Sequence, residues 1–259
     1  MKVSDIIGAI EEFAPASAQE SWDNTGLCIG SPSDEVGEVL LGLDCTPSLV
    51  DEAKALGANM IVTHHPLIFK GLRRISGDDP VGEAVMKAVR AGIAVYAAHT
   101  SADKVPGGVS WAMAERLSLS GCEVLDPESD GIGLGVVGNL PAPVSGREAV
   151  DLVKESFGLT ALRSSKPVEG PVKRVAVCGG SGASLIGAAE RAGAQLFVTA
   201  DVSYHNFFTP EGFMVMDIGH FESEVGIVSI LFSIIKKKFP NFAVRISDNI
   251  RNSNPIYYF

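Results

Sequence analysis

The sequence predicts an α/β protein made of two internally duplicated modules whose mixed sheets face a central cleft. Three observations lead to this fold class. Apolar strand patterns alternate with amphipathic helix patterns along most of the chain. The second half repeats the order of the first. Each of the five histidines lies at or just past the end of an apolar run, where α/β sheets build ligand sites.

Composition argues against several classes of partner. The 259 residues are 46% hydrophobic and 20% charged, which is typical of a globular protein with a large core. The net charge is −10 and the largest basic cluster is Lys236-Lys237-Lys238, so we expect no nucleic-acid-binding face. No apolar run is long enough to span a bilayer, and the N-terminus resembles a capped helix rather than a signal peptide. We therefore expect a cytoplasmic protein without a membrane partner.

The first half is expected to form a succession of strands and helices. Ser4 is the expected cap of a first helix, which Pro15 ends. Pro47 and Gly57 mark the start and the C-cap of a second helix over residues 47–56. Further helices are expected at residues 81–91 and 106–117, and strands at residues 27–29, 36–43, 61–63, 93–98 and 122–125.

The second half follows the same plan. Residues 56–65, moved on by 136 positions, fall on residues 192–201, where Gly, Ala, Val and Thr coincide. Each half also ends with a helix and a strand, the last one at residues 242–246. The matching order over a whole half favours duplication over a chance likeness of βαβ units. We expect a first module at residues 1–126 and a second at residues 127–259, with the C-terminal segment packing back on the first module.

His64 and His65 directly follow a buried strand. Inside a strand, consecutive side chains point to opposite faces, but these two stand where the strand ends. Pro66 restricts His65 to an extended or turn conformation, so both rings can reach one cleft. Taken alone, the pair is weak evidence for a metal site.

Two further motifs place a histidine and a carboxylate four residues apart. His99 ends an apolar strand and Asp103 follows, either as a ligand or as a turn or cap residue. His220 and Glu224 share one face of a predicted helix, a spacing by which two ligands on one helix bind one metal. His99 itself is either a partner that orients a ligand or a hydrogen-bonded core histidine.

Together these strand ends offer three imidazoles and two carboxylates as metal ligands: His64, His65, Asp103, His220 and Glu224. One tetrahedral ion needs fewer, so the set predicts two divalent ions that share ligands. Mixed nitrogen and oxygen ligation favours Zn, Fe or Mn. A metal pair activates water near neutral pH, which is typical of hydrolysis. The alternative is a set of core and loop residues that never meet in space.

Three other features remain open at this point. His205 is a candidate general acid or base, or a substrate ligand, and equally a surface histidine at the start of a helix. The turn Gly179-Gly180-Ser181-Gly182 is a tight turn or, less favoured, a phosphate site. Trp22-Asp23-Asn24 lines the cleft or forms an Asx-rich turn with a packed Trp.

The motifs as a set resemble the NGG-interacting-factor-three-like family, also labelled GTP cyclohydrolase I type 2 homologues. The resemblance covers nearly the whole chain and is carried by these motifs: Glu20-x-Trp22-Asp23-Asn24-x-Gly26, Thr63-His64-His65-Pro66, His99-Thr100-x-x-Asp103, Thr199-x-Asp201-x-x-x-His205 and Gly219-His220-x-x-x-Glu224. The connection from Asp126 to about Gly133 is short, which is similar to the short form without an insertion domain.

The resemblance implies two intertwined modules, a dinuclear metal centre on the five ligands named above, and a homohexamer. We therefore expect a dinuclear-metal-dependent hydrolase acting on a small nucleotide-like or phosphorylated substrate, with His205 or His99 assisting proton transfer. The label of GTP cyclohydrolase is a narrower version of this expectation. The alternative is a non-catalytic metal-binding scaffold or an interaction protein of the same family.

Overall fold

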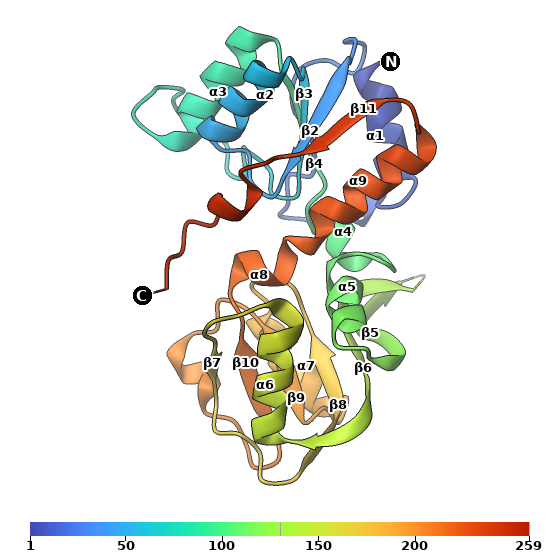
Figure 1. The fold of residues 1–259 in the computed structure, drawn as a ribbon, viewed down its shortest axis with the longest axis vertical. Coiled ribbons are helices and arrows are strands. Elements are labelled where there is room, and N and C mark those ends of the chain that lie inside the picture. Colours follow the sequence, from blue (N-terminus) through green and yellow to red (C-terminus); the bar gives the residue numbers. More distant parts are fainter. Residues whose placement is uncertain (130, 259) are drawn as a thin grey trace. The chain divides into compact units, whose positions relative to one another are not determined.

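The computed structural model describes residues 1–129 and 131–258, which fold into two compact units (Figure 1). The first unit contains residues 1–102 and 227–257, and the second contains residues 103–226 and Tyr258. Each unit has a mixed sheet with helices on both faces. Within the described residues, no helix is both long enough and apolar enough to cross a membrane.

The sheet of the first unit has the strand order β1-β4-β3-β2-β11. Its strands are β1 Gly26–Ile29, β2 Glu38–Gly42, β3 Met60–Thr63, β4 Ala94–Ala97 and β11 Ala243–Ile246. β1 is antiparallel to β4, whereas the other neighbours are parallel. The carboxyl ends of β2, β3 and β4 therefore lie at the same edge of this sheet.

Helices cover both faces of the first sheet, namely α1 Val3–Glu11, α2 Pro47–Leu56, α3 Pro80–Ala91 and α9 Gly226–Lys238. Leu40, Ile61 and Val95 are register partners on one face and pack against α2 and α3. On the opposite face, the Tyr96 hydroxyl donates to Glu11 of α1 at 3.2 Å. Figure 1 shows α9 beside α1 on this second side.

The sheet of the second unit has the strand order β5-β6-β8-β9-β10-β7. Its strands are β5 Ser120–Ser129, β6 Ile132–Ser145, β7 Arg163–Ser164, β8 Pro171–Val177, β9 Leu196–Thr199 and β10 Met214–Asp217. The pairs of β8 with β9 and of β9 with β10 are parallel, and the remaining pairs are antiparallel.

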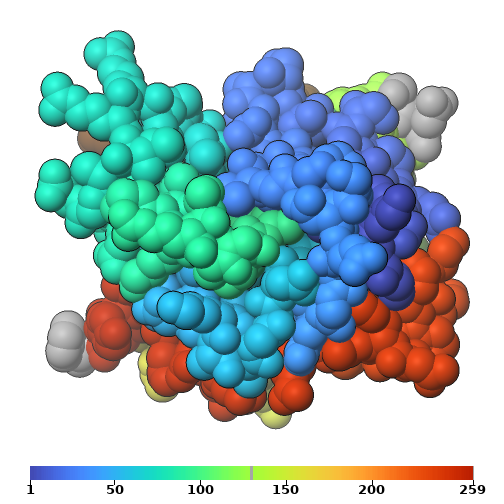
Figure 2. Space-filling view, turned by 90° about the horizontal axis from the view of Figure 1, so that it is seen from above, coloured from blue at the N-terminus to red at the C-terminus, as the bar shows by residue number. Residues whose placement is uncertain are grey.

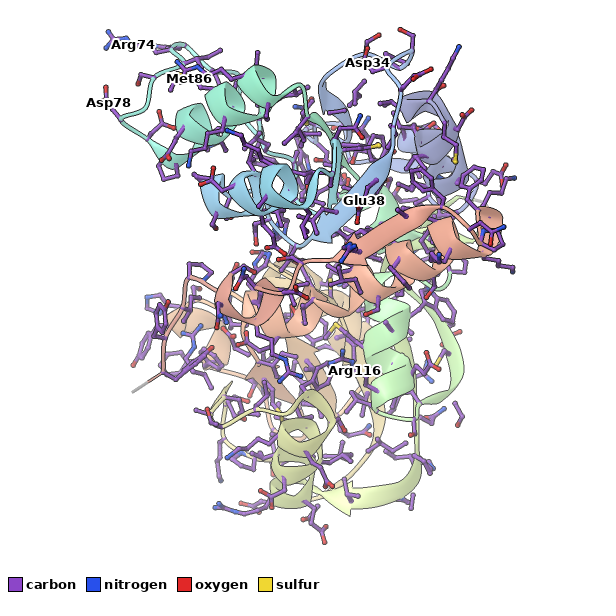
Figure 3. The ribbon with its side chains drawn as sticks, turned by 45° about the horizontal axis from the view of Figure 1, so that its top comes forward. Asp34, Glu38, Arg74, Asp78, Met86 and Arg116 are labelled. Carbon is purple, nitrogen blue, oxygen red and sulfur yellow. The ribbon has the colours of Figure 1, made fainter. Side chains whose placement is uncertain are left out.

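The helices of the second unit are α5 Val109–Arg116, α6 Gly146–Phe157, α7 Ile186–Arg191 and α8 His220–Glu224, and α4 Thr100–Lys104 lies where the chain enters the unit. Short 3-10 turns occur at η1 Ala16–Ala18, η2 Ala183–Leu185, η3 Tyr204–Phe207 and η4 Ile250–Asn252. α5 and α6 cover one face of the sheet, where Arg116 lies 5.6 Å from the Phe157 ring (Figure 3). α7 covers the other face, against Ala176 and Phe197.

The two sheets confirm the expected duplication. The order β1-β4-β3-β2 recurs as β7-β10-β9-β8, with one antiparallel pair followed by two parallel pairs in each. The halves also exchange their last strands. β5 ends the first half but joins the second sheet through β6, and β11 ends the second half but joins the first sheet. This exchange makes the modules intertwined.

Three differences from the sequence-based expectations are the most important for the fold. The chain enters the second unit at residue 103 rather than at 127 and returns at residue 227, because α5 and β5 pack with the second sheet. The first helix is capped at Lys2 and not at Ser4. The long strand β6 was not expected, because its glycines and prolines obscure the alternating pattern.

Candidate metal centre

Three histidines meet at the carboxyl edge of the first sheet. His64 and His65 directly follow β3, and His99 lies two residues beyond β4. A nitrogen of each ring lies within 4.8 Å of a nitrogen of both others, and the ring centroids are 5.0–5.5 Å apart. His64 is completely buried. The first unit therefore brings together the predicted pair and His99.

Each of these rings uses its Nδ1 atom for a short hydrogen bond to an oxygen acceptor. The bonds run from His64 to the Ala98 carbonyl at 2.9 Å, from His65 to Asp44 at 2.7 Å and from His99 to Asp23 at 2.7 Å. A carbonyl or carboxylate oxygen can only accept, so Nδ1 carries the proton in all three rings. In the neutral imidazole this leaves the lone pair on Nε2, the arrangement usual in metal-binding histidines.

Among these acceptors, the Asp23 carboxylate is held by several hydrogen bonds. Its side chain is fully buried and accepts hydrogen bonds from His99, from the Thr100 backbone and hydroxyl, from the Asn24 backbone and from the Thr25 hydroxyl. Burial alone would raise the pKa of Asp23, but the bonds from His99 and Thr100 outweigh it and hold that pKa well below its ordinary value. The carboxylate therefore stays charged and fixes the orientation of His99.

The second unit carries the matching histidine and carboxylate on α8. As expected from their spacing, His220 and Glu224 share one face of the helix, with Nε2 and Oε2 3.0 Å apart. The His220 Nδ1 atom donates to Asp201 at 2.8 Å. Because Nδ1 already carries a proton, the contact between Nε2 and a carboxylate is favourable only with a further positive charge, either a second proton or a metal ion.

Asp201 has a backbone conformation that suits a functional position. It is one of two non-glycine residues with positive φ in the described chain, at 53°. Its carboxylate accepts hydrogen bonds from Ser181 and His220. Burial raises the pKa of Asp201, but these two hydrogen bonds outweigh burial, so the pKa lies below its ordinary value. Asp201 is therefore placed to orient His220 as a carboxylate.

The glycine turn after β8 leaves room for Glu224. A Cβ atom on Gly180 would lie 2.2 Å from Oε1 of Glu224 and 3.3 Å from the His220 ring, and φ is +59°. The Gly180 amide donates to the Ser223 hydroxyl at 3.0 Å. The helix that follows, α7, has only six residues. These contacts favour the tight-turn interpretation over a phosphate site.

Cys178 lies buried close to the acidic side chains of the second unit. Burial, and then the charges of Asp103 and Glu224, raise the pKa of this thiol to about 12. In the metal-free protein the thiol therefore stays protonated at neutral pH. Asp103 and Glu224, both in the second unit, also have carboxylate oxygens within 4.8 Å of each other.

His205 lies apart from these ligands. It stands on the exposed turn η3, with its ring 5.3 Å from Tyr204 and 6.4 Å from Phe208. Among the described residues, it belongs to none of the groups that could hold a metal ion.

The hydrogen-bond acceptors Asp44 and the Ala98 carbonyl were not expected from the sequence. Asp44 follows the end of β2 by two residues, so the rule that located the histidines could also have located it.

Comparisons with known proteins cover the whole chain. The model of the family described as Duf34/NIF3 (NGG1p interacting factor 3) matches residues 1–255. A Lactococcus lactis protein named GTP cyclohydrolase 1 type 2 homolog is 35% identical over 264 aligned positions, which cover 99% of each chain. The crystal structure of a Staphylococcus aureus hypothetical protein superimposes with a TM-score of 0.92 and 27% identity, covering 100% of this chain and 99% of that one. A Bacillus cereus protein related to NIF3 shares the fold, with a TM-score of 0.94, 24% identity and the same coverage.

Proposed function

This chain belongs to the Duf34/NIF3 family, and we propose that it is a metal-dependent hydrolase acting on a small nucleotide-like or phosphorylated substrate. One observation carries the proposal. Four of the five histidines direct Nδ1 to a fixed oxygen acceptor and so keep Nε2 for another partner. A buried histidine that serves packing also needs an acceptor for its N–H group, but packing does not require the same nitrogen to donate in all four rings.

We propose two divalent ions held by His64, His65, Asp103, His220 and Glu224. The donor set fits such ions, because the imidazoles of His64, His65 and His220 are oriented by second hydrogen bonds through Nδ1. Mixed nitrogen and oxygen ligation favours Zn, Fe or Mn. When bound, these ions supply Lewis acidity and activate water.

His99 is the stronger candidate for proton transfer. Its Nδ1 atom is held by the buried Asp23 carboxylate, which stabilises the ring when Nε2 takes up a proton. The same contacts suit His99 as a further ligand, since its ring lies with those of His64 and His65. His205 is exposed and can exchange protons with solvent, so it remains the second candidate for this role.

A second candidate function is a metal-binding scaffold that recruits partners. Large apolar side chains are strongly exposed at Tyr204, Phe208 and Tyr257, at 71%, 72% and 74%. Such residues suit a protein interface. We also propose a homohexamer, which follows from the family resemblance, and a cytoplasmic location, which follows from the composition.

The test compares metal content and turnover in the same variants. Protein loaded with Zn, Fe or Mn is assayed against nucleotides and phosphate esters, and release of formate from GTP tests the narrower activity. His64→Ala and Glu224→Ala should lose bound metal and at least a hundredfold of turnover together, whereas Glu222→Gln on the same helix should keep both. Full turnover without metal would overturn the mechanism. Tightly held metal with no turnover on the panel would favour the scaffold.

A further inference from the structure

We propose that Trp22, Phe69 and the basic residues that follow Phe69 form a binding site for a nucleotide, with its ring on the aromatic pair and its phosphate on the basic residues. The inference rests on the proposed function, because it assigns substrate contacts beside the candidate metal ligands. All of these residues belong to the first unit.

The aromatic pair has an open stacking surface. Trp22 is 59% exposed and Phe69 is 44% exposed. Their ring centroids lie 5.9 Å apart at an interplanar angle of 71°, and the His99 ring meets Trp22 at 6.3 Å and 75°. Both neighbours are therefore nearly perpendicular to the indole, and neither is stacked parallel to it. A planar ring can stack on the exposed part of Trp22.

Trp22 stands on a turn that is held in place. The next residue, Asp23, is the buried carboxylate with several hydrogen-bond donors, and the Asn24 side chain donates to the Ile68 carbonyl at 2.5 Å. The turn of Trp22 and the segment of Phe69 are thus tied to each other. Because the turn and the segment that carry these rings are held in place before binding, ligand stacking loses little backbone conformational entropy.

The loop at residues 66–79 supplies positive charge next to the aromatic pair. Lys70, Arg73 and Arg74 are exposed, and no hydrogen bond or ion pair links them to other residues of the described chain. Figure 2 shows this turquoise loop projecting from the first unit, and Figure 3 shows Arg74 pointing outward. These three cations lie within five residues, whereas the acidic residues of the loop, Asp78 and Asp79, stand at its other end, where Asp79 caps α3. The cations suit the phosphate of a ligand whose ring lies on Trp22.

A nucleotide fits these features better than a second copy of the chain. The Trp22 ring lies beside His99, one of the three clustered histidines. A protein surface that covered this indole would also cover the approach to His99. A small anionic ring compound uses the aromatic faces and the charges together, and it brings its reactive atoms close to the candidate metal ligands.

The experiment follows the fluorescence of Trp22 in metal-free protein. The chain has two tryptophans, so Trp111→Phe leaves Trp22 as the only indole. GMP and CMP should quench its emission in a saturable manner, with GMP binding more tightly, and ribose 5-phosphate should not. Equilibrium dialysis measures the affinity for GMP. The affinity of Trp22→Phe should stay within a few-fold of the parent, and that of Trp22→Ala should be weaker by roughly tenfold or more.

A second arm tests the basic residues. Joint replacement of Lys70, Arg73 and Arg74 by Ala should weaken GMP binding about tenfold and reduce its dependence on salt. Arg90→Ala, an exposed cation on α3, is the matched control and should change neither.

Three results would overturn the proposal. The first is no quenching by millimolar GMP or CMP, and the second is an equal response to ribose 5-phosphate. The third is that acrylamide fails to quench Trp22 in an assembly of several copies and that this assembly dissociates in Trp22→Ala. That result would assign the indole to an interface between copies. Metal loading and turnover are measured separately, so a failure here leaves the proposed hydrolase testable.

Discussion

Single residues decide which nitrogen of each candidate histidine ligand is held by the protein. His64, His65, His99 and His220 all donate from Nδ1 to an oxygen of the protein. The sequence indicates these histidines as candidate ligands, because each follows an apolar run. It does not predict the acceptors of His64 and His99, because Ala98 contributes a backbone carbonyl and Asp23 comes from a distant turn. Asp44 was missed although it follows β2 by two residues.

Asp44 should govern metal affinity through His65. Asp44→Ala removes the acceptor at 2.7 Å, frees the ring to rotate and should weaken metal binding about 10- to 100-fold. Asp44→Asn keeps an oxygen acceptor and should lose less. Competition with a chromophoric chelator measures both affinities. Asp34→Ala, in a surface turn of the same unit (Figure 3), is the control. Equal affinity in all three variants would show that Asp44 does not position a ligand.

Gly180 should be required for the position of Glu224. In Gly180→Ala the new methyl group would meet Oε1 at 2.2 Å, so the carboxylate must move and bound metal should fall. Gly193→Ala is a close control, because φ is +74° and no atom lies within 4 Å of its added Cβ. Both variants should lose about 1–2 kcal/mol of stability from the left-handed backbone. Elemental analysis should find metal loss only in Gly180→Ala, and equal retention would contradict the role of this turn.

At the level of helices and strands, local sequence signals fix some boundaries and leave others undetermined. The helix over residues 47–56 is confirmed as α2, with Gly57 left-handed at its C-cap at φ 77°. The i,i+4 pair on α8 is confirmed as well. β6 was not predicted, because Gly133, Gly135 and Pro141 break its alternation of apolar and polar residues. Pairing with β5 and β8 stabilises this strand instead.

Glu52 on α2 should hold the segment that follows β11. Its carboxylate accepts from the Ser247 hydroxyl at 2.7 Å and from the Asp248 amide at 2.9 Å. It also accepts from the Asn249 side chain at 3.3 Å. Glu52→Ala removes all three bonds, and hydrogen bonds to a charged group contribute about 1.5–3 kcal/mol each. Hydrogen exchange of the backbone amides after Ile246, measured by mass spectrometry, should become at least tenfold faster.

The neighbouring Asp51→Ala removes an ion pair with Lys87 instead and should leave that exchange unchanged. If Glu52→Ala also left it unchanged, the segment after β11 would depend on other contacts.

At the level of the whole molecule, duplication and exchange explain why the module boundary was misplaced. The sequence repeat divides the chain near residue 126, but the sheets do not follow this division, because β5 and β11 each join the sheet of the other half. Strand exchange of this kind depends on pairing between distant residues. It leaves no trace in local periodicity, so only the family resemblance pointed to it.

Neither sequence half should fold alone. Residues 1–126 lack β11, so β2 would expose an unpaired edge, and β5 would lack β6. We expect residues 1–126 or 127–259 to show no cooperative thermal unfolding by circular dichroism when expressed separately. Their co-expression should give a complex that unfolds cooperatively. A cooperative transition in residues 1–126 alone would show that the exchange is not needed for stability.

The central claim is that the two halves together provide ligands for a pair of metal ions. Elemental analysis of protein purified without chelator and without a metal-binding tag tests it most directly. We predict about two equivalents of Zn, Fe or Mn per chain, falling in His64→Ala and in Glu224→Ala. A content near zero that persists after incubation with each metal would contradict the claim, and the proposed hydrolase would fall with it.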